Sequence, residues 1–163
     1  MRFPQLRRLR KVLSTTMIKN KLGNYDAISI RTIFYQRAEK DAVIKSRIGQ
    51  GKFRQDLIDY WCGCSVTDCQ THSLLIASHI RPWRKSNNQQ RLDVYNGLLL
   101  IPNLDKLFDK GYVSFDDNGD IITSDFLPMR EYKILGVNKS MHLVNLDPKH
   151  LPNLQYHQEN CLL

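Results

Sequence analysis

The stretch that decides the fold runs from Leu74 to Gly111 and reads LLIASHIRPWRKSNNQQRLDVYNGLLLIPNLDKLFDKG. It contains two short apolar runs, residues 74–77 and residues 98–101. Apolar runs of this length, bounded by turn residues, are typical of buried strands. The polar residues 84–91 lie between the two runs and predict a loop. The stretch therefore begins as strand, loop and strand.

A helix is predicted after the second run. Asn96 and Gly97 form a turn signal just before that run. Pro102 follows the run and suits the first turn of a helix, where a missing N–H costs nothing. Gly111 suits the end of that helix. Together these signals predict a small ββα unit.

The sequence on either side of this unit predicts more helix and one hairpin. Residues 27–48 and 52–61 carry apolar side chains at helical spacing, and the glycines of 49–51 separate them into two predicted helices. Downstream, the turn residues 116–119 lie between two apolar segments and predict a β-hairpin. The predicted fold class is α+β, with a ββα core, flanking helices and an extra β-hairpin.

Charge is unevenly distributed along the chain. The 163 residues include 24 lysines and arginines against 16 aspartates and glutamates, which gives a formal net charge of +8. Residues 1–25 hold seven basic side chains and no acidic one, so the remainder is nearly neutral. A basic arm of this kind is expected to meet a polyanion such as nucleic acid. A solvated amphipathic helix or an organellar targeting peptide would show the same pattern.

Composition excludes several classes of protein. With 42% apolar and 25% charged residues the chain resembles ordinary globular domains and not disordered ones. No run approaches the roughly 18 apolar residues of a membrane span, so we expect a cytoplasmic protein with reduced cysteines and no membrane partner. Three parts are expected: a basic N-terminal arm and helical lead-in at 1–45, the core at 46–125, and a C-terminal extension packed on the core at 126–163.

Four side chains of the ββα unit carry candidate chemistry. His79 ends the first strand region, and Asn96 opens the second. Asp105 and Asp109 are four residues apart and therefore share one face of the predicted helix. Two such carboxylates repel each other unless a cation lies between them, and oxygen donors favour Mg²⁺ or Mn²⁺. We expect a neutral histidine beside that ion to take a proton from water, which describes phosphodiester hydrolysis.

Each of these residues also has a simpler interpretation. A histidine at the end of an apolar strand is often a hydrogen-bonded core residue, and two aspartates four residues apart often form a solvated face. Asn-Gly is often only a turn. Their occurrence in this order, with spacings of 17, 9 and 4 residues, favours a common site.

The runs SHIRPW (78–83) and NGLLLIPNLDKLFDKG (96–111) resemble the HNH nuclease motif of the ββα-metal superfamily. Within that superfamily they are most similar to the restriction-endonuclease-like branch. The upstream run RIGQGKFRQDLIDYWCGCSVT (47–67) looks like the lead-in of that branch, and LQYHQEN (154–160) is similar to its C-terminal end. The resemblance implies an endonuclease with the ββα-metal fold.

This resemblance also implies a role for each candidate residue. His79 is implied as the general base, and Asn96 as the residue that braces the loop carrying that base. Asp105 falls where the family has its last motif histidine, a metal ligand, and Asp109 falls on a further ligand one turn later. An aspartate in place of that histidine favours hard ions. Ser78 stands where relatives often have another ligand, and we leave it out of the metal set.

Other polar side chains around the unit are candidates for binding. Basic residues flank it and are predicted to contact phosphates, although each alone could be a solvated surface charge. They are Arg54, Arg81, Arg84, Lys85 and Lys106.

A zinc knuckle is the alternative interpretation of Cys62, Cys64, Cys69 and His72. The C-x-C pair departs from the usual C-x2-C to C-x4-C clamp of zinc sites. We therefore expect buried structural thiols here and no zinc.

The sequence thus predicts a metal-dependent HNH endonuclease that hydrolyses DNA, of the restriction, defence or mobile-element type, with one Mg²⁺ or Mn²⁺ per site. The expected partner is double-stranded DNA and not a small-molecule substrate. A homodimer would explain how one site per chain cuts two strands. Two alternatives stay open: a DNA-binding accessory module with impaired catalysis, and an RNA-cleaving toxin-like nuclease.

Overall fold

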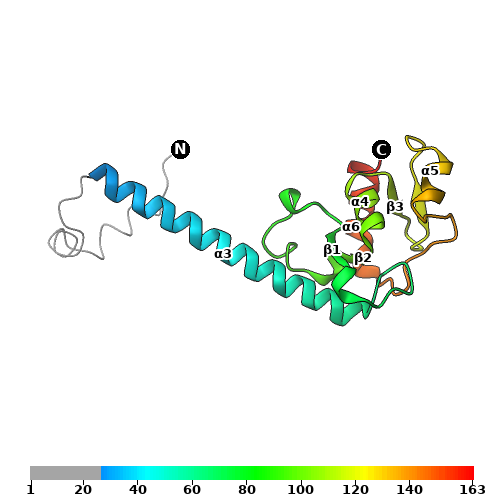
Figure 1. The fold of residues 1–163 in the computed structure, drawn as a ribbon, viewed down its shortest axis with the longest axis horizontal. Coiled ribbons are helices and arrows are strands. Elements are labelled where there is room, and N and C mark those ends of the chain that lie inside the picture. The colour runs from blue at the N-terminus through cyan, green and yellow to red at the C-terminus, as the bar shows by residue number, and fades with distance from the viewer. Residues whose placement is uncertain (1–26) are drawn as a thin grey trace. The chain divides into compact units, whose positions relative to one another are not determined.

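The computed structural model describes residues 27–163, so the basic arm predicted at residues 1–25 lies outside the described part. The chain divides into two units, Met1–Ser46 and Arg47–Leu163, and each is described by itself. Helix α3 begins in the first unit, and all other described elements lie in the second (Figure 1). No helix within residues 27–163 combines the length and apolar character needed to cross a membrane.

Helix α3 spans Ala27–Trp61 and is continuous, so the prediction of two helices was wrong. The glycines of 49–51 lie inside it. A glycine costs a helix roughly 1 kcal/mol relative to alanine, and tertiary packing readily outweighs that cost. Here Phe53, Leu57 and Trp61 are all buried and anchor the C-terminal part of the helix.

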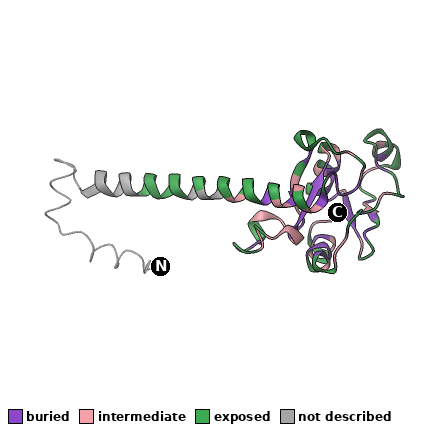
Figure 2. Ribbon diagram, turned by 90° about the horizontal axis from the view of Figure 1, so that it is seen from below, coloured by how far each residue is buried: buried purple, intermediate pink, exposed green. Residues whose placement is uncertain are grey.

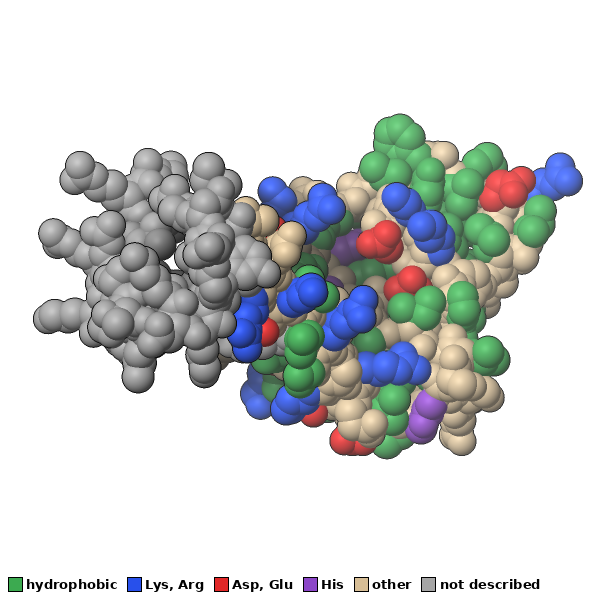
Figure 3. Space-filling model, turned by 60° about the vertical axis from the view of Figure 1, so that its left-hand side comes forward, with side chains coloured by type: hydrophobic (Ala, Val, Ile, Leu, Met, Phe, Trp, Pro, Cys, Tyr) green, Lys and Arg blue, Asp and Glu red, His purple; other side chains and the backbone are tan. Residues whose placement is uncertain are grey.

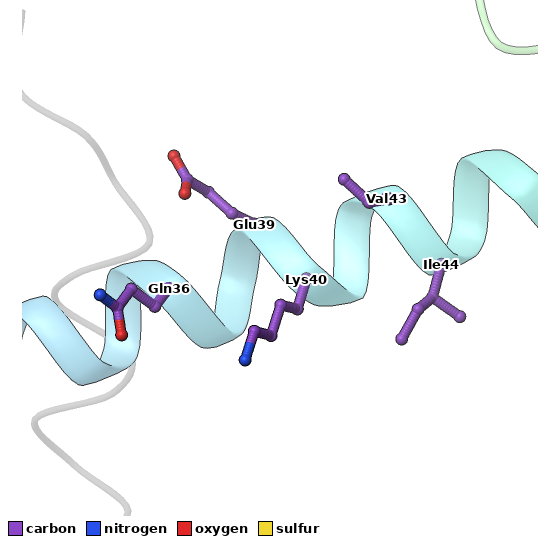
Figure 4. A pocket seen from close by; sticks show the side chains of 5 residues that line it. All are labelled: Gln36, Glu39, Lys40, Val43 and Ile44. Carbon is purple, nitrogen blue, oxygen red and sulfur yellow. The ribbon is translucent and has the colours of Figure 1, made fainter.

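The described side chains of α3 in the first unit are exposed (Figure 2). Five of them line a shallow hollow on the helix surface (Figure 4): Gln36, Glu39, Lys40, Val43 and Ile44. All five come from one helix, whereas binding sites for small molecules are concave and draw convergent groups from several elements. The described lining residues therefore have the character of a solvated helix face.

The predicted ββα unit is present in the second unit. Strand β1 (Ile76–His79) pairs antiparallel with strand β2 (Gly97–Leu100). Helix α4 (Pro102–Asp109) follows directly, with proline in its first turn as expected. Strand β1 begins two residues later than predicted, because His72–Leu74 form a 3-10 turn.

A second sheet and two more helices complete the fold. Strands β3 (Val113–Phe115) and β4 (Ile121–Thr123) form the predicted antiparallel hairpin. Helices α5 (Met129–Ile134) and α6 (Leu151–Asn160) follow, and α6 packs on β3. The predicted α+β class, with flanking helices and an extra hairpin, is confirmed. Further 3-10 turns lie at Trp83–Lys85, Val94–Asn96 and Pro148–His150.

Gly97 allows strand β2 to lie against helix α3. A Cβ atom at this position would lie 2.6 Å from the Phe53 ring and 2.7 Å from a Leu57 methyl group. The Trp61 indole also donates a hydrogen bond to the Gly97 carbonyl at 3.2 Å. Gly97 is extended, with a φ of −144°, and the preceding 3-10 turn ends at Asn96. The turn predicted before the second strand is thus this 3-10 turn, which the Gly97 amide closes by donating to the Val94 carbonyl, and close packing explains the glycine.

Helix α3 ends at a residue in the left-handed conformation. Cys62 has a φ of 57°, which favours glycine over residues with a side chain. Gly63 follows directly, and its φ is not positive. At Gly63 a Cβ atom would lie 3.1 Å from the Cys69 carbonyl oxygen, so close approach explains the glycine.

His157 docks helix α6 against helix α4. The ring is buried and stacks on Phe108, with 3.9 Å between centroids. Its Nε2 lies 3.2 Å from the Phe108 carbonyl oxygen, which can only accept, so Nε2 carries the hydrogen. Its Nδ1 then accepts from the Ser114 hydroxyl at 2.9 Å. Burial lowers the pKa of His157 to about 4, so this contact requires the neutral ring.

This contact predicts a loss of stability in mild acid. The unfolded chain takes up the His157 proton near pH 6.5, whereas the folded chain resists until about pH 4. Stability should therefore fall as the pH drops through this window, by about 3 kcal/mol from His157. Thermal unfolding from pH 7.5 to 4.5 measures it. His157→Gln should make stability depend less on pH. The contributions of His79 and His150 should remain, because burial also lowers the pKa values of both.

His142→Gln is the matched control, because His142 is exposed. It should keep the dependence of the wild type. Parallel curves for His157→Gln and the wild type would contradict the role given to His157.

Candidate active site

His79 is held between aromatic rings at the end of strand β1. Its ring stacks on Phe53 of α3, with 4.0 Å between centroids and 12° between planes. Trp83 meets it edge-on at 5.3 Å. Burial lowers the pKa of His79, and the positive charge of Arg91 acts in the same direction. The imidazole is therefore neutral near pH 7.

A backbone carbonyl fixes the tautomer of that imidazole. Nε2 of His79 lies 3.0 Å from the carbonyl oxygen of Arg91. A carbonyl oxygen only accepts hydrogen bonds, so Nε2 carries the hydrogen and Nδ1 keeps its lone pair. Nδ1 is thus the nitrogen that can take a proton.

Asn96 ties together the loop that separates β1 from β2. The side chain is fully buried. Its Oδ1 accepts from the Arg81 amide at 2.8 Å, and its Nδ2 donates to the Gln90 carbonyl at 2.9 Å. The Ile80 amide also donates to the Asn96 carbonyl at 3.0 Å. One side chain therefore joins the start of the loop to its end, next to the Arg91 carbonyl that holds His79.

Asp105 and Asp109 lie one turn apart on helix α4. Asp105 is half-buried, whereas Asp109 is exposed. Burial raises the pKa of Asp105, and the negative charge of Asp109 raises it further, whereas Ser78 and the charge of Lys106 act against the rise. Within residues 27–163 neither carboxylate takes part in an ion pair. The pair is therefore short of compensating positive charge.

The donor set fits a hard divalent cation. In the described part of the chain no three side chains of His, Cys, Asp or Glu lie close enough together to hold an ion. His79, Asp105 and Asp109 thus do not form the three-membered cluster around one ion that the sequence suggests. Mg²⁺ keeps several waters and is commonly bound through one or two carboxylates plus substrate phosphate. Asp105 and Asp109 match that requirement as two oxygen donors.

Backbone hydrogen bonds hold the cysteine segment before β1. Cys64 is buried, and its amide donates to the Cys69 carbonyl at 2.8 Å. Cys62 is exposed, and its carbonyl oxygen lies 3.1 Å from Nε2 of His72. The His72 ring is thus engaged in a backbone contact.

Arg54 contacts the protein backbone. Its guanidinium donates to the carbonyls of Leu75 and His72, each at 2.6 Å. It therefore joins helix α3 to the start of strand β1. Arg54 therefore has a structural role. The predicted phosphate contacts then depend on the other basic residues.

Those basic residues lie in the loop after β1 and on helix α4. The Arg81 guanidinium lies over the ring of Tyr156 at 4.0 Å, which orients it. Arg84, Lys85 and Lys106 are exposed. Lysine and arginine side chains, with a few carboxylates among them, are spread over the face in Figure 3.

Two residues contribute to the site but are absent from the set predicted from the sequence. The first is Ser78, which acts to lower the pKa of Asp105 and is absent from the predicted site. The second is Arg91, whose carbonyl fixes His79 and whose guanidinium donates to the Trp83 carbonyl and lies 4.8 Å from the centre of its ring. Every residue has a backbone carbonyl, so the sequence does not indicate which one contacts His79.

Replacing Asn96 by Ala should destabilise the protein by about 1–3 kcal/mol, because the Arg81 amide and the Gln90 carbonyl lose a buried partner. Urea unfolding at neutral pH measures the change. Asn118→Ala, at an exposed position, is the control and should stay within about 0.5 kcal/mol of the wild type. Equal stabilities of the two variants would contradict the bracing role of Asn96.

Comparison with known proteins identifies the segment that carries this geometry. Residues 64–116 match the family model of the HNH endonuclease. No curated protein matches the chain. The matched segment includes β1, β2, α4 and β3, and with them His79, Asn96 and both helix carboxylates. Residues 64–116 of this chain therefore form a domain of the HNH endonuclease family.

Proposed function

We propose that this chain is a metal-dependent endonuclease that hydrolyses DNA phosphodiester bonds. His79 is the general base, and Asp105 and Asp109 hold one Mg²⁺ or Mn²⁺ ion. The observation that carries the proposal is the neutral, oriented imidazole at the end of β1 within an HNH domain. The uncompensated carboxylate pair on α4 supports the metal assignment.

The proton of the attacking water passes to Nδ1 of His79. The Arg91 carbonyl accepts from Nε2–H throughout and stabilises the imidazolium that results. Phe53 and Trp83 keep the ring from rotating. General-base catalysis of this kind contributes about 10²- to 10⁴-fold in rate.

The two carboxylates act from helix α4, which packs against strand β1. A divalent cation held there would stabilise negative charge on the phosphate and on the leaving oxygen. His79 faces helix α3, where its ring stacks on Phe53.

Double-stranded DNA is the proposed substrate. Arg81, Arg84, Lys85 and Lys106 would contact its phosphates, and the basic residues 1–25 would add to the attraction. Phosphate contacts position a duplex without reading its sequence. A homodimer would bring two sites to two strands, as a cytoplasmic restriction, defence or mobile-element enzyme requires.

A DNA-binding module without catalysis is the second candidate. One observation favours it: no group of three metal-ligating side chains is found within residues 27–163. Such a module would bind DNA with the same salt dependence and leave it intact. An RNA-cleaving nuclease would use the same residues on a different polymer, because the site acts on a phosphate.

Replacing His79 by Gln should lower the rate of plasmid cleavage by about 10²- to 10⁴-fold, because the general base is lost. DNA affinity and the circular dichroism spectrum should be retained. Cleavage is measured with Mg²⁺ or Mn²⁺ and with EDTA, on supercoiled plasmid and on RNA of similar length. His142→Gln, at an exposed position, should cleave like the wild type.

Full activity of His79→Gln would contradict the base assignment. Intact plasmid in every metal, with normal binding, would favour the DNA-binding module. Cleavage of the RNA alone would replace DNA as the substrate.

Replacing Arg84 and Lys85 together by Ala should weaken DNA binding at all sequences. Each lost phosphate contact should lower the slope of log affinity against log salt by about 1. Fluorescence anisotropy at several salt concentrations measures the slope. Arg130→Ala with Lys133→Ala, two exposed positions on α5, is the control with the same charge change. Identical slopes for the two double variants would contradict the placement of DNA over the loop after β1.

A further inference from the structure

Arg81 follows His79 by two residues, and its guanidinium lies against an aromatic ring of helix α6. The guanidinium carbon is 4.0 Å from the centre of the Tyr156 ring. A cation in this position is attracted by the negative π face of the ring. The contact therefore joins the loop after strand β1 to the C-terminal helix.

The backbone of Arg81 is fixed independently of this ring. Its amide donates to Oδ1 of Asn96 at 2.8 Å, and its carbonyl accepts from the Ser86 hydroxyl at 3.1 Å. Asn96 and Ser86 are both buried, so water does not readily replace either partner. Only the long side chain of Arg81 then needs a support, and Tyr156 supplies it.

Helix α6 gives the Tyr156 ring a rigid base. The two residues that follow Tyr156 are both tied to other elements. His157 stacks on Phe108 with 3.9 Å between centroids, and Gln158 donates to the Phe115 carbonyl at 2.8 Å. Helix α6 also packs on strand β3. The ring is thus attached to a backbone with little freedom to move.

The charge of Arg81 has no carboxylate to balance it. In the part of the chain that the structure describes, Arg81 takes part in no ion pair, and its Nε is buried without a hydrogen-bond partner. The N–H groups of a guanidinium lie in its plane, whereas a stacked ring covers only a face. Stacking on Tyr156 therefore orients the group and leaves its Nη donors available. Such donors match the oxygens of a phosphate.

We propose that Tyr156 is a positioning residue that holds the Arg81 guanidinium by stacking, in the orientation that binds a backbone phosphate of DNA. This inference rests on the proposed function, in which Arg81 contacts DNA phosphates. An arginine side chain that is already ordered loses less conformational entropy when DNA binds. Removal of the ring should therefore weaken DNA binding although every charge is kept.

The test measures binding of the full chain to a fluorescein-labelled DNA duplex, by anisotropy in the presence of EDTA. Tyr156→Leu removes the π face and should weaken binding by about 3- to 30-fold, the range that a cation–π contact is worth. Tyr156→Phe keeps the face and should bind within about twofold of the wild type. In an Arg81→Gln background, Tyr156→Leu should change affinity by less than about twofold, because the guanidinium is already absent.

Tyr112→Leu is the matched control. Tyr112 is also half-buried and packs against the core, and it should bind DNA like the wild type after the change. Circular dichroism checks that each variant folds. If Tyr156→Leu does not fold, Tyr156→Met takes its place, because a flexible methionine fills the space of the ring without its π face. The same loss of affinity is expected from it.

Wild-type affinity in Tyr156→Leu would overturn the proposal. So would an equal loss in Tyr156→Phe or Tyr112→Leu, because stacking would then not be the cause. An undiminished effect of Tyr156→Leu in the Arg81→Gln background would show that Tyr156 acts without Arg81, which also contradicts the proposal.

Arg81→Gln separates this inference from the proposed function. If Arg81→Gln weakens binding and Tyr156→Leu does not, only the role of Tyr156 fails. If Arg81→Gln binds DNA like the wild type, the phosphate contact of Arg81 fails and the role of Tyr156 with it. If the wild type itself binds no DNA, the proposed function fails.

Discussion

The buried amide of Asn96 is the constraint on which the rest of the site depends. Two of its hydrogen bonds join the Arg81 amide to the Gln90 carbonyl, so the loop between the strands has a fixed path. The carbonyl that follows Gln90 belongs to Arg91 and accepts from His79. Without a fixed loop that carbonyl would have no defined place. The orientation of the imidazole thus depends on a side chain in the turn directly before strand β2.

The surrounding fold supplies rigid walls for this arrangement. Helix α3 presents Phe53 to the His79 ring, which is possible because Gly97 lets β2 approach the helix closely. His157 of α6 also donates a hydrogen bond to the Phe108 carbonyl of α4. Helix α4, which carries Asp105 and Asp109, therefore packs between strand β1 and helix α6. His79 and the two carboxylates are thus held by different elements, strand β1 and helix α4.

The sequence predicts the ββα order and the α+β class well, because turn residues and apolar runs act locally. It fails where tertiary contacts override local preference. The glycines of 49–51 are tolerated because the end of α3 is buried. Gly97 is needed because a side chain there would clash with Phe53 and Leu57 of α3. Spacing likewise indicates His79 and Asn96 as candidates, but it does not indicate the Arg91 carbonyl, because that contact depends on the path of the loop.

The central claim is that His79 is neutral, with hydrogen on Nε2 and a free lone pair on Nδ1. Long-range ¹H–¹⁵N correlation spectra of the ¹⁵N-labelled protein, recorded at neutral pH, report the tautomer of each histidine ring directly. The account predicts an Nε2–H signature for His79 that persists below the pH at which exposed histidines become charged. A charged ring at neutral pH, or hydrogen on Nδ1, would contradict it.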